Sequence, residues 1–236
     1  MQTQNKYQNK LFSILGDSIS TLSGYSIPDY ATYYDISRGL YAQVITPDDT
    51  WWGQVINRLG GELLVNNSFS GSTVCWDSRY EIQSYGCSDE RTSGLDDNGK
   101  MPDVIMIFIG INDFGKGTKI TAEKDGSEDL SVFSVAYAKM LEQLRYNYPN
   151  AELWCFTFPL STCKSRENFV FPYCRGGIHI EQYCDAIRDA IRKCALQNKC
   201  RIIDLYASNV TYDTVDGFHP NAEGMKTIAD AVLEQL

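Results

Sequence analysis

Two short stretches near opposite ends of the sequence hold the residue types of a nucleophilic serine mechanism. Near the start, an apolar run over residues 11–15 leads directly into Gly16-Asp17-Ser18. Such a run is typical of a buried strand, and it would place the Ser18 hydroxyl at the carboxyl edge of a sheet, where open α/β folds put their chemistry. A serine hydroxyl is a weak nucleophile until a base takes its proton. Ser18 is therefore a candidate nucleophile that needs partners, because the motif alone is also compatible with a helix-capping serine.

The second stretch, Asp-Gly-Phe-His at residues 216–219, supplies both partners. Asp216 precedes His219 by three residues, so its carboxylate can fold back and accept a hydrogen bond from Nδ1 of the imidazole. Nε2 then faces outward and can take the proton of Ser18, while the carboxylate stabilises the imidazolium that forms. The alternative is a polar loop that caps the helix after it. We predict Ser18 as the nucleophile, His219 as the base and Asp216 as the group that orients the base.

A serine mechanism also needs N–H donors where negative charge develops on the attacked carbonyl oxygen. Three candidates follow predicted strands: the backbone N–H of Ser18, the backbone N–H of Gly71 and the side-chain amide of Asn112. Glycine lets the backbone approach a substrate closely, and an asparagine amide offers two N–H groups. Each could also be a simple turn residue. We predict that Ser18, Gly71 and Asn112 together form an oxyanion hole.

The elements that must position these residues alternate between strands and helices along the chain. Such alternation implies parallel strand pairing through right-handed crossovers. We therefore expect one three-layer α/β/α domain over residues 1–236, built on a five-stranded parallel sheet. Apolar runs predict strands at 11–15, 63–65, 103–109, 153–158 and 200–205, and helical spacing predicts helices at 51–59, 130–146, 178–197 and 221–236.

Two longer segments fit neither pattern. Residues 21–50 are rich in Gly, Pro, Ser and Tyr with little helical period, which predicts an ordered, irregular segment over the face that holds Ser18. This segment could be functional or could be a structural cover. Residues 75–100 are dense in Ser, Asp, Gly and charged residues, which predicts a surface excursion.

Three other polar residues are expected to have structural roles. We expect Asp17 and Asp113 to brace loops through nearby N–H groups, and His179 to lie at the surface or cap a helix.

Composition and charge narrow the class of protein. The chain of 236 residues is 43% apolar and 22% charged, as is usual for a soluble globular domain. Its net charge of −9 argues against a nucleic-acid partner. No apolar run is long enough to span a membrane, and the polar N-terminus lacks a signal segment, which predicts a cytoplasmic protein. A secreted or periplasmic location is expected instead if a signal segment has been removed.

The eight cysteines favour buried thiols over a disulfide framework, because a chain of this size does not need covalent staples. Cys155 lies in a predicted strand, and Cys184 and Cys194 fall on the apolar side of a predicted helix. The lack of a C-x-x-C pair and the presence of only two histidines argue against structural zinc, so we expect no metal. If the protein is exported, pairs across loops become possible: Cys163 with Cys174, or Cys75 with Cys87.

Together the four blocks resemble the SGNH hydrolases, which are the GDSL-type esterases and lipases. The blocks are Gly-Asp-Ser, the glycine of Ser-Phe-Ser-Gly-Ser, Gly-Ile-Asn-Asp and Asp-Gly-Phe-His, and they stand in the family's order. The resemblance implies the roles already given to Ser18, Asp216 and His219, and an oxyanion hole of Ser18, Gly71 and Asn112. It also implies a flavodoxin-like sheet in the order 2-1-3-4-5, and no cofactor. The sequence departs from the fullest motif in having Ile-Ser after Gly-Asp-Ser where the family has leucine, a position that contributes packing.

We therefore expect a serine esterase that hydrolyses carboxylic esters, with a short acyl group on a carbohydrate or another small molecule. The aromatic loops that flank the predicted site favour such a substrate. Two alternatives stay open. An O-acyltransferase would use the same acyl-enzyme and pass the acyl group to an alcohol. A non-catalytic carbohydrate-binding protein could use the same scaffold, although the complete set of candidate catalytic residues counts against it.

Overall fold

A parallel sheet of five strands forms the centre of the molecule in the computed structural model. The strands lie in the order β2-β1-β3-β4-β8, which is 2-1-3-4-5 when only these five are counted along the chain. The predicted fold class and strand order are confirmed. The strands are β1 (Leu11–Gly16), β2 (Glu62–Ser68), β3 (Val104–Phe108), β4 (Glu152–Phe156) and β8 (Cys200–Ile203). The structure describes residues 6–76, 84–124, 126–161, 174–175, 177–194 and 200–236.

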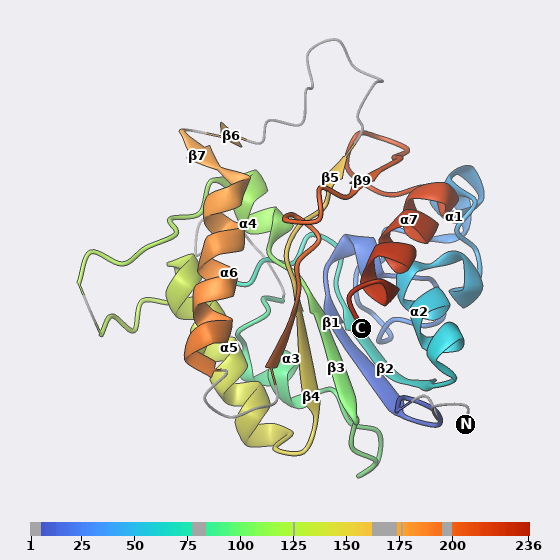
Figure 1. Cartoon of the computed structure of the whole chain (residues 1–236), viewed down its shortest axis with the longest axis horizontal. Helices are drawn as coiled ribbons and strands as arrows, with labels where there is room; N and C mark the ends of the chain where they lie inside the picture. The colour runs from blue at the N-terminus through green and yellow to red at the C-terminus, as the bar shows by residue number, and fades with distance from the viewer. Residues whose placement is uncertain (1–5, 77–83, 125, 162–173, 176, 195–199) are drawn as a thin grey trace.

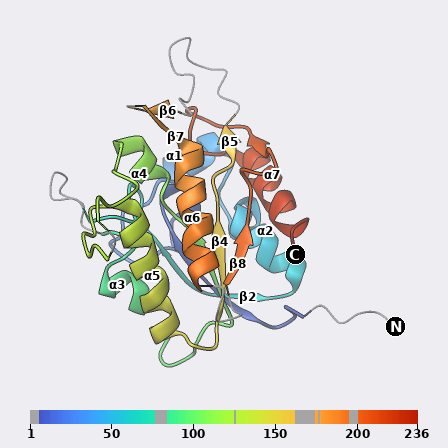
Figure 2. The same ribbon diagram turned by 60° about the vertical axis from the view of Figure 1, so that its left-hand side comes forward.

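Helices cover both faces of this sheet and complete the three layers (Figures 1 and 2). On one face lie α2 (Trp51–Leu59) and α7 (Ala222–Leu233), with α1 (Ile36–Ala42) beside them. On the other lie α5 (Phe133–Asn147) and α6 (Ile180–Cys194), with α3 (Asp89–Ser93) next to α5. The shorter elements are the 3-10 helices η1 (Ser18–Ser20) and η2 (Pro47–Asp49), helix α4 (Ile111–Lys116), and the strand pairs β5 (Leu160–Ser161) with β9 (Thr211–Tyr212) and β6 (Cys174–Arg175) with β7 (Ile178–His179).

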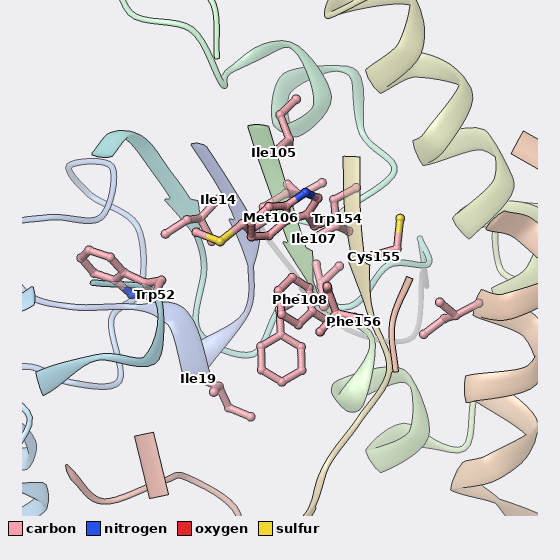
Figure 3. Packing of buried hydrophobic residues seen from close by; sticks show 14 of the residues in the cluster. Ile14, Ile19, Trp52, Ile105, Met106, Ile107, Phe108, Trp154, Cys155 and Phe156 are labelled. Carbon is pink, nitrogen blue, oxygen red and sulfur yellow. The ribbon is translucent and has the colours of Figure 1, made fainter. Parts of the chain in front are cut away.

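The central strand β3 lies within the core, and all five of its residues are buried. A continuous apolar run suits this position because helices cover both faces of the strand. Toward α2, the rings of Phe108 and Phe156 stack with centroids 5.3 Å apart, and Figure 3 shows them side by side. The indole of Trp51 meets both rings edge-on at 5.4 and 5.1 Å. Aromatic packing thus fixes α2 against the middle of the sheet.

Strand β2 is longer than predicted. It continues past the expected range of 63–65 to Ser68, through residues whose polar side chains are buried. The Asn66 side chain donates to the carbonyl of Ser20 at 2.8 Å and accepts from the Ser68 hydroxyl at 2.6 Å. These bonds offset the cost of burying the polar groups, so the strand can carry them up to the carboxyl edge.

The segment over residues 21–50 is ordered, as expected, but it is not irregular throughout, because it contains α1 and η2. The prediction failed for a physical reason. The outer face of α1 exposes large apolar side chains, with Ile36 at 78% and Tyr41 at 77%. Its buried positions are only Gly39 and Ala42. Helix α1 therefore lacks an apolar stripe that faces the core, so the hydrophobic periodicity of the sequence could not predict it.

The prediction of a surface excursion over residues 75–100 holds only in part, because residues 97–100 are exposed whereas several other described residues of this range are buried. Arg91 in α3 is completely buried, and burial lowers the pKa of its guanidinium to about 10. Burying a cation is costly unless hydrogen bonds compensate it, and here only Nε of Arg91 has no partner among the described residues. Nη1 and Nη2 each make two hydrogen bonds of 2.8 to 2.9 Å, to Ser72 Oγ and Ser84 Oγ and to the carbonyls of Gly16 and Asn67.

Two buried carboxylates brace the strand-end loops, as predicted. The Asp113 carboxylate accepts from the backbone N–H groups of Val74 at 2.7 Å and Cys75 at 3.1 Å, and thereby joins α4 to the loop after β2. Asp17 accepts from the N–H of Ile19 at 3.1 Å and caps η1. Burial outweighs these bonds and raises the pKa of Asp17 to about 7 and that of Asp113 to about 6.

Cys75, Cys87, Cys155 and Cys184 are buried, and Cys200 is partly exposed. Cys75 and Cys87 are both buried thiols, so the alternative that paired them is wrong. Burial raises the pKa of the Cys87 and Cys184 thiols to about 12, which keeps them protonated. Cys163 lies outside the described residues, and its pairing stays a prediction. Within the described ranges, no three His, Cys, Asp or Glu side chains are grouped to hold a metal ion, and no helix is both long and apolar enough to cross a membrane.

Replacing Arg91 by Met should destabilise the fold strongly. The substitution removes four hydrogen bonds and leaves two buried carbonyls without their donor, so we expect the free energy of unfolding to fall by about 3–5 kcal/mol. Urea denaturation measures this value. Arg192→Met is the matched control, because Arg192 is exposed and its ion pair with Asp189 is of the surface kind, worth less than about 1 kcal/mol. Equal losses in the two variants would contradict the role of Arg91.

Asp17→Asn should flatten the dependence of stability on pH. A carboxyl whose pKa is about 7 in the folded protein but about 4 in the unfolded chain binds its proton more tightly when folded. Its contribution to the free energy of unfolding is therefore largest below about pH 4 and is lost as the pH rises to about 7. The asparagine oxygen can still accept from Ile19, so the variant removes only the titration. The prediction would be refuted if the free energy of unfolding changed by the same amount between these pH values in the variant and in the parent.

Asp113→Asn contrasts with Asp17→Asn, because it should disrupt a hydrogen bond and lower the stability of the fold. Both oxygens of Asp113 accept from backbone N–H groups, so an amide must set its own NH₂ against one of them. We expect this variant to lose about 1–3 kcal/mol at neutral pH.

Candidate active site

Ser18, His219 and Asp216 form one chain of hydrogen bonds at the carboxyl edge of the sheet. Ser18 lies two residues after the end of β1 as the first residue of η1, and the other two residues lie in the loop between β9 and α7. Ser18 Oγ lies 2.9 Å from Nε2 of His219, and Nδ1 of the same ring lies 2.8 Å from Asp216 Oδ2. Residues 201 positions apart in the sequence therefore meet with the geometry in which an imidazole can take the serine proton.

The tight turn that presents Ser18 depends on Gly16. A Cβ at this position would lie 2.6 Å from the Ser68 hydroxyl and 2.8 Å from the Cβ of Ser20, so only glycine fits between β2 and η1. The carbonyl of Gly16 accepts from Arg91 at 2.8 Å. The strand end before Ser18 is thus held from two sides.

Asp216 shapes its own loop as well as orienting the imidazole. Its Oδ1 accepts from the backbone N–H groups of Phe218 at 2.9 Å and His219 at 2.8 Å, while Oδ2 faces the imidazole. Gly217 between them has φ of +94°, a left-handed conformation that suits glycine. Burial by itself would raise the pKa of Asp216, but the hydrogen bonds and charge of His219 and the hydroxyl of Tyr33 hold it well below its usual range. The carboxylate is therefore ionised at neutral pH.

The three predicted oxyanion donors come from the ends of β1, β2 and β3, which are neighbours in the sheet. Gly71 has φ of +84°, which disfavours other residues, and a Cβ there would meet no atom within 4 Å. Asn112 lies in the first turn of α4, and its amide donates to the carbonyl of Ser72 at 2.9 Å. Because an amide has two N–H groups, this bond orients Asn112 and leaves one donor for another acceptor. Ser18, Gly71 and Asn112 thus share one edge.

Tyr33 contacts both His219 and Asp216, and no specific sequence pattern pointed to it. The phenol ring stacks on the imidazole with centroids 3.4 Å apart and planes 11° from parallel. Its hydroxyl donates to Asp216 Oδ2 at 2.9 Å. Tyr33 is one of several tyrosines in the segment over residues 21–50, and only the aromatic content of that segment pointed toward the site. His179, by contrast, lies exposed before α6, as expected.

A family model described as GDSL-like Lipase/Acylhydrolase matches residues 10–161. The matched span contains Ser18, Gly71 and Asn112, whereas Asp216 and His219 lie beyond it. Among proteins with curated descriptions, none matches this sequence.

Solved structures with the same fold cover nearly the whole chain. A structure described as a GDSL-like lipase from Bacteroides ovatus has 29% identity and a TM-score of 0.71, and the alignment covers 96% of this chain and 97% of that one. A second, from Bacteroides uniformis, has 28% identity, a TM-score of 0.70 and coverages of 97% and 95%. A family two carbohydrate esterase from Clostridium thermocellum, in complex with cellohexaose, shares the fold at 15% identity and a TM-score of 0.60, over 97% of this chain and 64% of that one. Because the family model matches more than half of the chain, the chain belongs to the GDSL-like lipase/acylhydrolase family of ester hydrolases.

Proposed function

We propose that the protein hydrolyses carboxylic esters through an acyl-enzyme on Ser18. The observation that carries this proposal is the unbroken chain of hydrogen bonds from the Ser18 hydroxyl through His219 to an ionised Asp216. Nucleophilic catalysis requires a serine hydroxyl activated by an adjacent base, and this chain of hydrogen bonds supplies that base.

In the first half of the reaction, Ser18 Oγ attacks the ester carbonyl while Nε2 of His219 takes the hydroxyl proton. The Asp216 carboxylate stabilises the imidazolium that results. The tetrahedral intermediate then collapses, the imidazolium gives its proton to the leaving alcohol, and the acyl group stays on Ser18. In the second half, His219 takes a proton from water, which attacks the acyl carbonyl. The second tetrahedral intermediate collapses by breaking its bond to Ser18 Oγ, the imidazolium returns its proton to Oγ, and the acid is released.

The negative charge of each tetrahedral intermediate is assigned to the edge where β1, β2 and β3 end. The backbone N–H groups of Ser18 and Gly71 and the second N–H of Asn112 would donate to the oxyanion. The α4 helix and the Ser72 carbonyl hold the Asn112 amide before substrate arrives. Donors fixed in advance cost no reorganisation during the reaction, which is why they stabilise the transition state strongly.

The proposed substrate is a short acyl ester of a carbohydrate or another small molecule. Two aromatic side chains in the segments that follow β1 and β2, Tyr25 and Trp76, remain 46% and 48% exposed. Exposed aromatic faces of this kind can stack on sugar rings. The similarity in fold to a carbohydrate esterase that was solved with cellohexaose also favours this class.

Ser18→Ala should abolish turnover of p-nitrophenyl acetate and labelling by a fluorophosphonate probe. Removing the nucleophile should lower kcat by at least about a thousandfold while the folded protein persists. Ser23→Ala is the control, because Ser23 is exposed and lies in the same part of the chain. Unchanged turnover in Ser18→Ala would refute the mechanism.

Analysis of the product in the presence of a sugar acceptor separates two reactions. Free acid as the product supports hydrolysis, whereas an acylated sugar indicates an acyltransferase.

The kcat/KM of ester hydrolysis should rise with pH from about 5 to 8, because the imidazole must be neutral to accept the serine proton. Asp216 stays ionised throughout this range because its pKa is lowered, so its titration adds no second inflection to the pH profile of kcat/KM. A profile without slope would count against His219 as the base. His219→Ala should remove activity, and His179→Ala, which changes the other histidine of the chain, should not.

A further inference from the structure

A closed ring of hydrogen bonds runs through the candidate active site and includes Tyr33. The hydroxyl of Thr21 donates to the carbonyl of Ser18 at 2.9 Å and accepts from the backbone N–H of Tyr33 at 2.9 Å. The side chain of Tyr33 then donates to Asp216 Oδ2 at 2.9 Å. The bonds from Asp216 to His219 and from His219 to Ser18, of 2.8 and 2.9 Å, complete the ring. The segment after the nucleophile is thus connected directly to the loop that carries the base.

The stack between Tyr33 and His219 adds a second constraint, because parallel rings 3.4 Å apart restrict the rotation of the imidazole. The phenol also presents its negative π face to the ring that becomes an imidazolium during the reaction. A cation over an aromatic face is stabilised electrostatically. Among the described residues, the titratable and charged groups around this pair include Asp216, Tyr34, Tyr41 and Arg38, whose guanidinium carbon lies 5.4 Å from the Tyr33 ring centre.

The backbone of Tyr33 is itself held in place by its neighbour. Tyr34 is fully buried, its hydroxyl donates to the carbonyl of Pro220 at 2.7 Å, and its own carbonyl accepts from the N–H of Ser23 at 3.0 Å. The rings of Tyr33 and Tyr34 meet edge-on at 4.9 Å. Two successive tyrosines therefore attach the loop of His219 to the segment that follows Ser18.

We propose that Tyr33 is a positioning residue for the Asp216–His219 pair, which fixes the imidazole plane through its ring and the carboxylate through its hydroxyl. This inference rests on the proposed function of the site. Tyr33 touches no reacting atom and acts through its two neighbours. It gives the segment over residues 21–50 a functional role, the first of the two interpretations that the sequence left open.

The two contacts have opposite effects on the pH–rate profile, which separates them experimentally. The hydroxyl withdraws charge from Asp216, so Tyr33→Phe should leave a stronger carboxylate beside the imidazole and move the acidic midpoint of kcat upward by about 0.3–1 pH unit. The same variant should lower kcat about 3–10-fold with little change in KM, because the carboxylate loses a charge-assisted hydrogen bond. Tyr33→Leu also removes the stack, so it should lower kcat further and place the midpoint below that of Tyr33→Phe.

Tyr30→Phe is the matched control, because it removes a hydroxyl from the same segment whose partner is the exposed Glu90. It should leave kcat and the midpoint unchanged. A Tyr33 with a merely structural role would lower the folded fraction of its variants without moving the midpoint. Changes in Tyr33→Phe below about twofold in kcat and about 0.1 pH unit in the midpoint would overturn the proposal, since a hydrogen bond to a carboxylate contributes more than that.

A second readout does not depend on turnover. The Cε1–H signal of His219 in a proton NMR titration can be assigned by comparison with His179→Ala, because the chain has only two histidines. The titration midpoint of this signal should shift in Tyr33→Phe in the direction given above. If Ser18→Ala retained activity, the proposed function would fail, but the NMR titration would still decide whether Tyr33 tunes the pair. An unshifted midpoint would refute the role of Tyr33 whatever the chemistry of the site.

Discussion

Arg91 is a buried cation, and it finds its hydrogen-bond acceptors where the carboxyl ends of β1 and β2 meet the loop after β2. Its four hydrogen bonds hold the carbonyls of Gly16 and Asn67 and the hydroxyls of Ser72 and Ser84 around one guanidinium. Gly16 lies two residues before Ser18, and Ser72 follows Gly71. The nucleophile and a candidate oxyanion donor are thus positioned by the same charge.

The site has a second half that is fixed by different means. His219 and Asp216 arrive on a loop from the far end of the chain, and aromatic stacking and hydroxyl donors from Tyr33 and Tyr34 attach that loop. Ionic hydrogen bonding therefore fixes the half that carries Ser18, and tyrosines fix the other. The short distance from Ser18 to His219 depends on both systems, since neither strand pairing nor helix packing joins the two loops directly.

The parts of the fold that repeat along the chain could be predicted from the sequence. The apolar run of β3 and the apolar stripe of α2 follow from burial, and the spacing of Asp216 and His219 follows from turn geometry. Arg91 and Tyr33 could not be predicted, because one side chain that satisfies scattered acceptors leaves no periodic trace. The same reason explains the end of β2, where the amide of Asn66 is satisfied by the carbonyl of Ser20, which is distant in sequence. The oxyanion roles of Gly71 and Asn112 stay predictions that agree with their positions.

The separation of Ser18 and His219 along the chain has a consequence for synthesis in the cell. A polypeptide emerging from the ribosome exposes Ser18 long before it contains Asp216 and His219. Until the last loop has docked against Tyr33, the serine hydroxyl has no base and stays chemically inert on the mechanism proposed above. Translation and folding therefore delay the appearance of a reactive serine until the sheet beneath it is complete, and a prematurely terminated chain would carry the nucleophile without being able to use it.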